Sequence, residues 1–489
     1  MQNLNESLQA KYPHLEISVF NFKKVSTHLI FGSEFNNNTR EQALQTLNLN
    51  SNKTLNDYFD LINITVSSVK ESVYVYDLTH SLGNFMCDVE LSNDDLGSTK
   101  KEAIVGDFVI SRLRSYLQEM AVIQPKNFRQ LLSTEYLVYR AKTDLLSANT
   151  LMVFALTKEI QTILNHSQYG TEHPRFYEFV LNEMPIPNAL LALNNYIDLI
   201  MKKAYEILET SKVLYKEAQE LLYKELELDF KNPLKSLLKS SLQAKKPSEL
   251  ANINDISKKY PHLNISVRPL SKSLYKSGRL DSEYYQSKYD LMETKIKSFS
   301  HKKLGELVSI QKSIEPGSEA YQDEGIEFVR VANLGKFGLS KSDIYLNEQD
   351  FSKELKKLAP KKETILLSKD VSIGISYCLE EDLECITSGA ILHLKVKDKR
   401  EILPQVLSLI LNSIVVKLQA ERDAGGSIIS HWKISEIENV LIPLFDFKLQ
   451  EQIALKIQKS FTLRAKSKDL LEYAKVKVEQ NIQTPANQA

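Results

Sequence analysis

The nine residues KYPHLEISV at positions 11–19 recur almost unchanged as KYPHLNISV at positions 259–267. The two copies are 248 positions apart, which is about half of the 489-residue chain. Solenoid proteins repeat with periods of about 20 to 50 residues. A period near half the chain therefore indicates a duplicated domain, and so two similar globular units in one polypeptide.

Five further matches occur in the same order in both halves. They pair SEF (33–35) with SEY (282–284), DFVIS (107–111) with TILLS (364–368), STEYLVYR (133–140) with SGAILHLK (388–395), the turn of Gly170 and His173-Pro174-Arg175 with that of Gly426 and His431-Trp432-Lys433, and Ile186-Pro187 with Ile442-Pro443. Short matches that keep one order, with an offset that drifts only from 248 to 257, predict a duplication along the whole chain.

Each half mixes short β-branched or aromatic runs with turns and short helices. The runs that predict strands are 66–78, 107–113 and 136–142 in the first half, and 327–334, 364–369 and 390–397 in the second. We therefore expect an α+β protein with two domains of α/β type, at 1–187 and 259–443. Residues 229–258 are polar and rich in Lys, contain Pro233 and Pro247, and are typical of a linker.

After each Ile-Pro dipeptide, apolar and small residues recur in alternating steps of four and three, the heptad pattern of paired helices. The first seam is Ile197, Met201, Ala204, Leu208, Ser211, Tyr215, Ala218 and Leu222; the second is Ile453, Ile457, Ser460, Ser467, Leu471, Ala474 and Val478, interrupted by Arg464. Small residues every seven positions allow two helix backbones to approach closely. We expect spacer helices at 188–228 and 444–480, followed by a tail at 481–489, to pair as an antiparallel coiled coil.

The alternative is that each helix lies separately on its own domain. Four apolar residues also lie off the first seam, and they either pack on the domains or leave an edge for partner helices; they are Ile200, Ile207, Leu214 and Leu221.

Composition excludes few classes. The net charge is zero, and no segment approaches the roughly 18 apolar residues of a membrane span, so a cytoplasmic protein is expected. Cys87, Cys378 and Cys385 lack the spacing of a metal site and are interpreted as reduced, packed thiols. We find no nucleotide-binding glycine loop, nucleophile elbow or H-E-x-x-H. Asn232-Pro233 is followed by Leu234 and is not the N-P-P-aromatic signature of an amino-methyltransferase.

The second half contains a series of longer sequence motifs, called phrases below. They are RLDSEYYQSKYDLME (279–293), KKLGELVSIQKSIEPG (302–317), GIEFVRVANL (325–334), TILLSK (364–369), SGAILHLK (388–395), GGSIISHWKISEIENVLIPL (425–444) and LQEQIALKI (449–457). With these phrases the chain resembles the DNA specificity subunits of type I restriction-modification systems, and the separate recognition subunits of some related type II systems. The first half has GSEF (32–35) in place of the family's opening phrase, and lacks a clear counterpart of GIEFVRVANL.

The resemblance implies a non-catalytic subunit with two target-recognition domains and an antiparallel helical spacer. Each domain would read one part of a split, asymmetric site in double-stranded DNA. The implied partners are adenine methyltransferase subunits and a restriction or translocase subunit. S-adenosylmethionine, ATP and magnesium would bind to those partners, and no cofactor or metal is expected on this chain.

The side chains that read DNA are predicted near strand ends and turns, where polar groups can reach bases and phosphates. The candidates are Arg112, Arg114, Tyr116 and Arg175 in the first half, and Lys312, Arg330, Asn333, Lys336, Lys369 and Ser372 in the second. Each could instead be a solvated surface residue. Trp432, the single tryptophan, is interpreted as an apolar anchor beneath its turn.

Two other functions remain open. One is a recognition subunit of a type II restriction-methyltransferase enzyme, and the other is a coiled-coil scaffold that binds proteins and no DNA. The sequence does not reveal the DNA target, because one fold reads many sequences and DNA shape adds to the readout.

Overall fold

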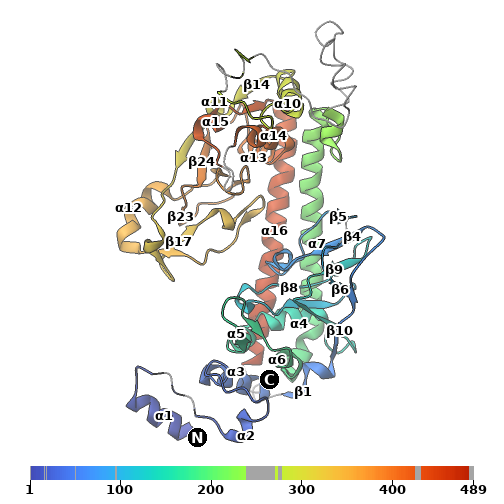
Figure 1. Cartoon of the computed structure of the whole chain (residues 1–489), viewed down its shortest axis with the longest axis vertical. Coiled ribbons are helices and arrows are strands. Elements are labelled where there is room, and N and C mark those ends of the chain that lie inside the picture. The colour runs from blue at the N-terminus through green and yellow to red at the C-terminus, as the bar shows by residue number, and fades with distance from the viewer. Residues whose placement is uncertain are drawn as a thin grey trace. The chain divides into compact units, whose positions relative to one another are not determined.

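The computed structural model describes residues 2–15, 17, 19–49, 51–93, 96–237, 270–271, 273, 278–424 and 431–483 (Figure 1). The chain divides into two compact units, Met1–Leu208 with Ala465–Ala489 (unit 1) and Glu209–Arg464 (unit 2). The second nonapeptide (259–267), most of the predicted linker, Gly425 and Gly426 lie outside the described residues. The predicted boundaries set two spacer helices apart, whereas the compact units divide each long helix between them.

Unit 1 is a mixed α+β structure. Its elements are α1 (Gln2–Lys11), α2 (Phe22–Val25), α3 (Asn38–Asn48), β1 (Ser51–Thr54), η1 (Leu55–Asp57), β2 (Phe59–Ile62), β3 (Thr65–Val66), β4 (Val73–Tyr76), η2 (Leu78–Ser81), β5 (Leu91–Ser92), β6 (Lys100–Ala103), β7 (Phe108–Ser111), η3 (Ser115–Leu117), β8 (Met120–Val122), β9 (Gln130–Leu132), β10 (Tyr136–Ala141), α4 (Ala148–Ala155), α5 (Lys158–Asn165), β11 (Gln168–Tyr169), β12 (Arg175–Phe176), α6 (Glu178–Asn182), β13 (Pro185–Pro187) and the first part of α7 (Asn188–Glu225).

Unit 2 is of the same class. Its elements are α10 (Ser287–Lys297), β14 (His301–Lys303), α11 (Leu304–Leu307), β15 (Val308–Lys312), η5 (Ser318–Ala320), β16 (Tyr321–Gln322), β17 (Ile326–Val329), η6 (Val331–Asn333), β18 (Leu334–Gly335), β19 (Gly338–Leu339), β20 (Tyr345–Leu346), α12 (Glu348–Leu358), β21 (Ile365–Ser368), β22 (Ser376–Cys378), β23 (Cys385–Thr387), β24 (Ile391–Val396), α13 (Pro404–Leu411), α14 (Ile414–Asp423), α15 (Ile434–Glu438), β25 (Leu441–Pro443) and the first part of α16 (Phe447–Ile482). The mixed fold class is confirmed in both units.

The two units share one strand order. Unit 1 has a four-stranded sheet β2-β10-β7-β8, and unit 2 has a four-stranded sheet β15-β24-β21-β22. All neighbours in both sheets are antiparallel. The central strands β7 and β21 are buried at every position, because their apolar residues meet helices or strands on both faces.

A second sheet in each unit contains a parallel pair. β4 pairs with β9 in unit 1, and β17 pairs with β23 in unit 2. In each parallel pair, the strand that comes first in the sequence is followed by a 3-10 helix: η2 follows β4, and η6 follows β17. The segment 73–81, VYVYDLTHS, is thus the structural counterpart of GIEFVRVANL that the sequence comparison did not find.

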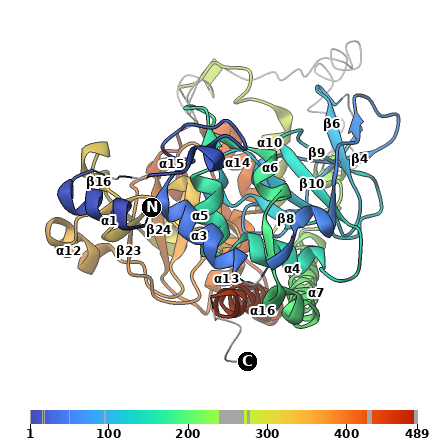
Figure 2. The same cartoon turned by 90° about the horizontal axis from the view of Figure 1, so that it is seen from below.

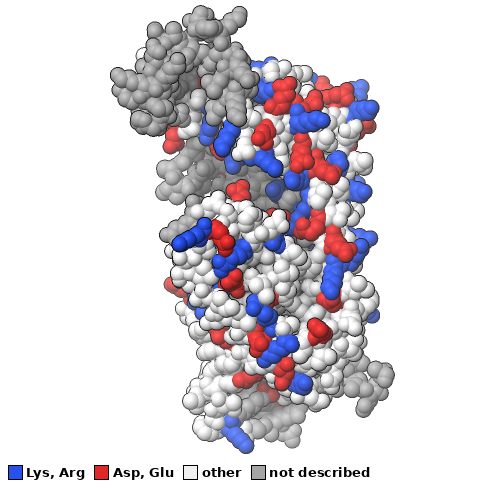
Figure 3. Space-filling model, turned by 90° about the vertical axis from the view of Figure 1, so that its right-hand side faces the viewer, with Lys and Arg blue, Asp and Glu red and all other residues white. Residues whose placement is uncertain are grey.

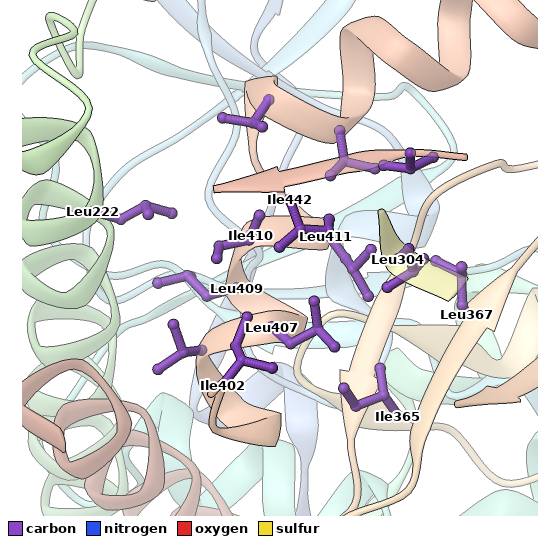
Figure 4. Close-up of a cluster of buried hydrophobic side chains, with 14 of the residues drawn as sticks. Leu222, Leu304, Ile365, Leu367, Ile402, Leu407, Leu409, Ile410, Leu411 and Ile442 are labelled. Atoms are coloured by element: carbon purple, nitrogen blue, oxygen red, sulfur yellow. The ribbon is translucent and has the colours of Figure 1, made fainter. Parts of the chain in front are cut away.

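The core of unit 2 brings its sheet, α13 and the long helices together. Figure 4 shows Leu222 of α7 pointing toward Leu409 and Ile410 of α13, with Ile365 of β21 in the same buried cluster. Trp432 belongs to this cluster with 1% of its surface exposed, which confirms the predicted apolar anchor.

In unit 1 the two long helices lie side by side and run antiparallel (Figures 1 and 2). The hydroxyl of Ser467 on α16 donates to the carbonyl oxygen of Ala204 on α7 at 2.8 Å, and the hydroxyls of Tyr196 and Tyr473 are 3.0 Å apart. The seam residues of unit 1 are all buried; they are Ile197, Met201, Ala204, Leu208, Ser467, Leu471, Ala474 and Val478. A side-chain bond to a facing helix backbone requires the close approach that the small seam residues allow.

Unit 2 repeats this arrangement. The hydroxyl of Ser460 donates to the carbonyl oxygen of Ser211 at 2.8 Å, and Lys456 forms an ion pair with Glu217 at 2.5 Å. Its seam residues are also buried; they are Ser211, Tyr215, Ala218, Leu222, Ile453, Ile457 and Ser460. The guanidinium of Arg464 lies 3.7 Å from the ring centroid of Phe337, which explains how a cation is tolerated in the seam.

The helix ends differ slightly from the predicted ones for local reasons. α7 ends at Glu225 because Glu227 adopts a left-handed conformation (φ 53°), and the N–H of Leu228 bonds back to Tyr223. α16 begins after Asp446, whose carboxylate caps the N–H of Lys448 at 2.9 Å.

Packing on the domains accounts for most of the off-seam residues of α7. Ile200 packs against the core of unit 1, Leu221 packs against that of unit 2, and Ile207 is 8% exposed. Cys378 and Cys385 are buried as expected, and burial raises the pKa of the Cys385 thiol to about 12. Cys87 is exposed, so its interpretation as a packed thiol was wrong: it lies in the irregular segment between η2 and β5.

None of the helices in the described ranges combines the length and the apolar character that a membrane crossing requires.

Candidate functional site

The segment that follows β7 in unit 1 runs beside the short strand β12. Leu113 forms an isolated antiparallel bridge with Arg175, and the N–H of Phe176 donates to the carbonyl oxygen of Arg112 at 3.1 Å. We call residues 111–118 together with 173–176 the first cross-strand turn. It brings together all four predicted residues of the first half, Arg112, Arg114, Tyr116 and Arg175.

The end of β21 in unit 2 has the same geometry. Asp370 forms an isolated antiparallel bridge with His431, and the N–H of Trp432 donates to the carbonyl oxygen of Lys369 at 2.9 Å. We call residues 368–375 together with 431–432 the second cross-strand turn. The structural counterpart of Arg175 is therefore His431. The sequence comparison had aligned His173 with His431 on the shared letter, which shifts the register by two residues.

Both turns contain a non-glycine residue in the left-handed region at the same place. Arg114 (φ 48°) follows Leu113, and Val371 (φ 64°) follows Asp370. This conformation is unfavourable for residues other than Gly, and most of all for a β-branched one such as Val. Strained backbone is concentrated at functional sites, where the surrounding structure enforces it. The turns are therefore candidate sites in both units.

Ion pairs organise the first cross-strand turn. Arg175 holds Glu135 through Nε (3.0 Å) and Nη2 (2.7 Å), and Arg112 contacts the same carboxylate through Nε (3.2 Å). Arg112 also donates to Glu178 at 3.1 Å. A terminal nitrogen of Arg114 lies 3.2 Å from Nδ1 of His173. The turn thus holds two guanidinium groups on one carboxylate, and a third guanidinium, that of Arg114, lies beside His173.

The Glu135 carboxylate remains charged in this setting. Hydrogen bonds from Arg175, and then from Arg112, lower the pKa of Glu135 below its usual value against the opposing effect of burial. The carboxylate therefore acts as a fixed anion that orients cations, and both of its oxygens are in use.

The second cross-strand turn contains a similar arrangement with other side chains. Asp370 pairs with Lys369 through one oxygen, and with Nδ1 of His431 through the other at 2.5 Å. Lys369 and Asp370 are mostly buried, whereas the side chain of His431 is 67% exposed. The imidazole of His431 is therefore the most accessible of these three side chains, and the sequence interpretation did not single it out.

The remaining predicted residues are distributed over unit 2 and the first turn. Tyr116, Lys312 and Ser372 are exposed. Arg330 pairs with Asp343 at 2.8 Å. Lys336 lies 4.9 Å from the ring of Phe337 in the β18–β19 hairpin.

Asn333 is better explained as a turn-stabilising residue. Its amide oxygen accepts the N–H of Arg330 at 3.0 Å, and its amide nitrogen donates to the carbonyl oxygen of Lys341 at 3.2 Å. The residue is 8% exposed, so the amide is used inside the fold and does not face a ligand.

The β18–β19 hairpin also contacts the long helices of unit 2. The ring of Phe337 packs edge-on against Tyr215 of α7 at 4.8 Å between centroids, and Tyr215 stacks with Phe461 of α16. The loop GKFG (335–338) thus brings the β18–β19 hairpin into contact with the long helices of unit 2.

Charges of both signs are intermixed on the face shown in Figure 3, without a broad field of one sign. Within the described ranges, no three His, Cys, Asp or Glu side chains are grouped as metal ligands would be.

Residues 296–473 match the family model described as "Type I restriction modification DNA specificity domain". The matched family is one of non-catalytic domains, in agreement with the sequence prediction, and the match confirms the resemblance to specificity subunits. No curated protein matches the chain.

The chain is similar to a number of solved structures, three of which are described here. One concerns complex assembly and conformational transition of a type I R-M system (17% identity, 88% of this chain and 95% of that chain, TM-score 0.27). The others are the type I S subunit from M. genitalium (13%, 88% and 94%, 0.36) and the HsdS subunit from Thermoanaerobacter tengcongensis (15%, 88% and 96%, 0.27).

Proposed function

We propose, from the premise that residues 296–473 carry the DNA specificity domain of type I restriction-modification systems, that the chain reads a bipartite, asymmetric DNA sequence. Each unit reads one part through its cross-strand turn. The observation that supports this most directly is the recurrence of one turn in both units with different side chains, Arg112 and Arg175 in one and Lys369 and His431 in the other. Similar backbones with different contact groups would read two different sequences.

The two long helices serve as the spacer in this proposal. From Ile197 to Leu222 a helix rises about 38 Å at about 1.5 Å per residue. This length is comparable to one turn of B-DNA, the natural separation of half-sites approached from one face. The duplicated-domain organisation at 1–187 and 259–443, with α7 and α16 between the readers, belongs to the same proposal.

The partners are adenine methyltransferase subunits and, in a complete type I complex, a restriction or translocase subunit. An apolar surface of unit 1 is suited to a protein partner; it comprises Tyr196, Leu199, Tyr473 and Val476, exposed by 46%, 66%, 46% and 39%. S-adenosylmethionine, ATP and magnesium would be bound by the partners, and the complex would act in the cytoplasm.

The test is to map methylated adenines in cells that express the full chain with its modification subunit, and in cells that express the modification subunit alone. We expect a split asymmetric motif only when the chain is present. Methylation that does not depend on the chain would favour the scaffold function. A split motif made and cleaved without a translocating subunit would favour the type II recognition subunit.

A further inference from the structure

Each cross-strand turn places a carboxylate between two basic side chains, but the two carboxylates come from different positions. In unit 1 it is Glu135, whose carbonyl oxygen accepts the N–H of Arg112 at 3.2 Å. In unit 2 the carbonyl that accepts the N–H of Lys369, at 2.9 Å, belongs to Ala390, which has no carboxylate.

At the bridge position of each turn, it is unit 2 that has a carboxylate and unit 1 that lacks one. Asp370 supplies the carboxylate of unit 2 from the bridge opposite His431, whereas the bridge position of unit 1 is Leu113, opposite Arg175. A duplication alone would place the carboxylate at the same position in both units. The chain instead has the same arrangement, a carboxylate that contacts two basic side chains, built from two different positions, which indicates that the arrangement itself is required.

We propose that Glu135 and Asp370 are positioning residues that hold the basic side chains of their own units in the orientation that contacts DNA bases, and that His431 contacts DNA in unit 2 as Arg175 does in unit 1. This inference rests on the proposed function. The ligand is the set of base edges in double-stranded DNA, and each carboxylate acts through the basic side chains it holds.

The geometry of Arg175 shows how such positioning works. A guanidinium has five N–H donors. Nε and Nη2 of Arg175 donate to Glu135, and Nη1 donates to the carbonyl oxygen of His173 at 3.1 Å. These contacts leave one donor on each terminal nitrogen. Two terminal donors are the pair that contacts the O6 and N7 atoms of guanine.

The carboxylates lie where they can restrict these side chains. Glu135 is 24% exposed and Asp370 is 13% exposed, so both are supported by surrounding protein, whereas the side chain of His431 extends to the surface. A long cation that is fixed along one edge loses less freedom on binding than one that samples many rotamers. Each carboxylate therefore favours a single reading orientation.

The first experiment compares full-length Glu135→Gln with a matched control, Glu102→Gln. Glu102 holds Arg129 through two contacts of 3.0 Å in the same unit, and it is 27% exposed. Each chain is expressed with its modification subunit, and methylation is measured at sites with single-base changes in either half. We expect Glu135→Gln to reduce discrimination roughly 5- to 150-fold in one half only. Glu102→Gln should leave both halves unchanged.

The second unit is tested in the same way. Asp370→Asn should relax only the other half of the motif, and its control is Asp398→Asn, which removes a surface pair with Arg400. His431→Ala should relax the same half as Asp370→Asn. The unit 2 variants test the same positioning role if the Glu135→Gln chain does not fold or does not bind its modification subunit.

Relocation of the carboxylate separates positioning from a general structural role. Glu135→Ala combined with Leu113→Asp moves the carboxylate of unit 1 to the place that it occupies in unit 2. We expect the double variant to recover discrimination that Glu135→Ala alone loses, whereas thermal stability should not follow the same order.

The outcomes distinguish a failure of the proposed function from a failure of the positioning role of the carboxylates. If the unaltered chain gives no split motif, the proposed function fails. If it gives a split motif but Glu135→Gln and Asp370→Asn leave both halves unchanged, or relax both halves equally, the carboxylates do not position the readers. An unchanged motif with His431→Ala would remove His431 as a DNA contact.

Discussion

Replacement of Ser460 by Leu tests whether the small seam residues determine the distance between the long helices. Ser460 is fully buried in unit 2, where its hydroxyl donates to the carbonyl oxygen of Ser211 at 2.8 Å and lies 3.1 Å from the Ser211 hydroxyl. A leucine removes these contacts and adds bulk where the facing backbone lies within hydrogen-bond distance.

The expected loss has two parts. The lost hydrogen bonds cost about 1 kcal/mol, and the overpacked seam costs about 1–3 kcal/mol. For a unit of this size, each 1 kcal/mol lowers the melting temperature by about 2–4 °C. We therefore expect the unfolding transition of unit 2 to fall by on the order of 8 °C in calorimetry of the full chain.

The neighbouring position provides the control. Lys459 is on the same helix and is exposed, so Lys459→Leu introduces the same side chain outside the seam. It should change the melting temperature by about 1–2 °C at most, since surface substitutions are usually within about 0.5 kcal/mol. The reasoning is refuted if both variants lose the same stability, or if Ser460→Leu is as stable as the unaltered protein.

Three further substitutions probe unit 2 in unfolding experiments, and Gly32→Ala in unit 1 is the control for one of them. Leu222→Ala should cost about 2–5 kcal/mol in urea titration, because the side chain is fully buried in the cluster of Figure 4; a cost below about 1 kcal/mol would contradict this. Gly325→Ala should destabilise strongly, because φ is +127° and the new Cβ would lie 2.3 Å from the carbonyl oxygen of Leu346, whereas Gly32→Ala, with open space, should not. Burial lowers the pKa of His393 to about 4 from an ordinary 6.5, so the unfolded chain takes up a proton first and stability falls as pH drops from 6.5 toward 4. The loss is on the order of 3 kcal/mol, and His393→Gln should flatten this part of the pH–stability curve.

The heptad seams show what sequence reasoning predicts well. All fifteen proposed seam residues are buried, because alternating steps of four and three select one helix face whatever the domains do. The strands at 107–113, 136–142, 364–369 and 390–397 were found for a similar reason, since their long β-branched and aromatic runs are buried on both sides.

The turns show where the same reasoning stops. Glu135 and Arg175 are 40 positions apart, and only the tertiary fold brings them together. The counterpart of GIEFVRVANL was missed because VYVYDLTHS keeps the strand and the turn but few of the letters. Asn333 was selected as a polar residue near a strand end, although its amide closes the turn itself.

Unit 1 is assembled from two segments that lie far apart in the sequence, so it cannot be completed until the end of the chain has been synthesised. Its core includes Leu471, Ala474 and Val478 of α16, packed with Ile197 and Met201 of α7. These residues leave the ribosome more than 250 positions after Leu208, a delay of roughly 13–50 s at about 5–20 residues per second. Unit 2 is continuous in sequence and can close while unit 1 waits with an open apolar face. Nascent unit 1 is therefore the part of the chain most exposed to chaperones and proteases during synthesis.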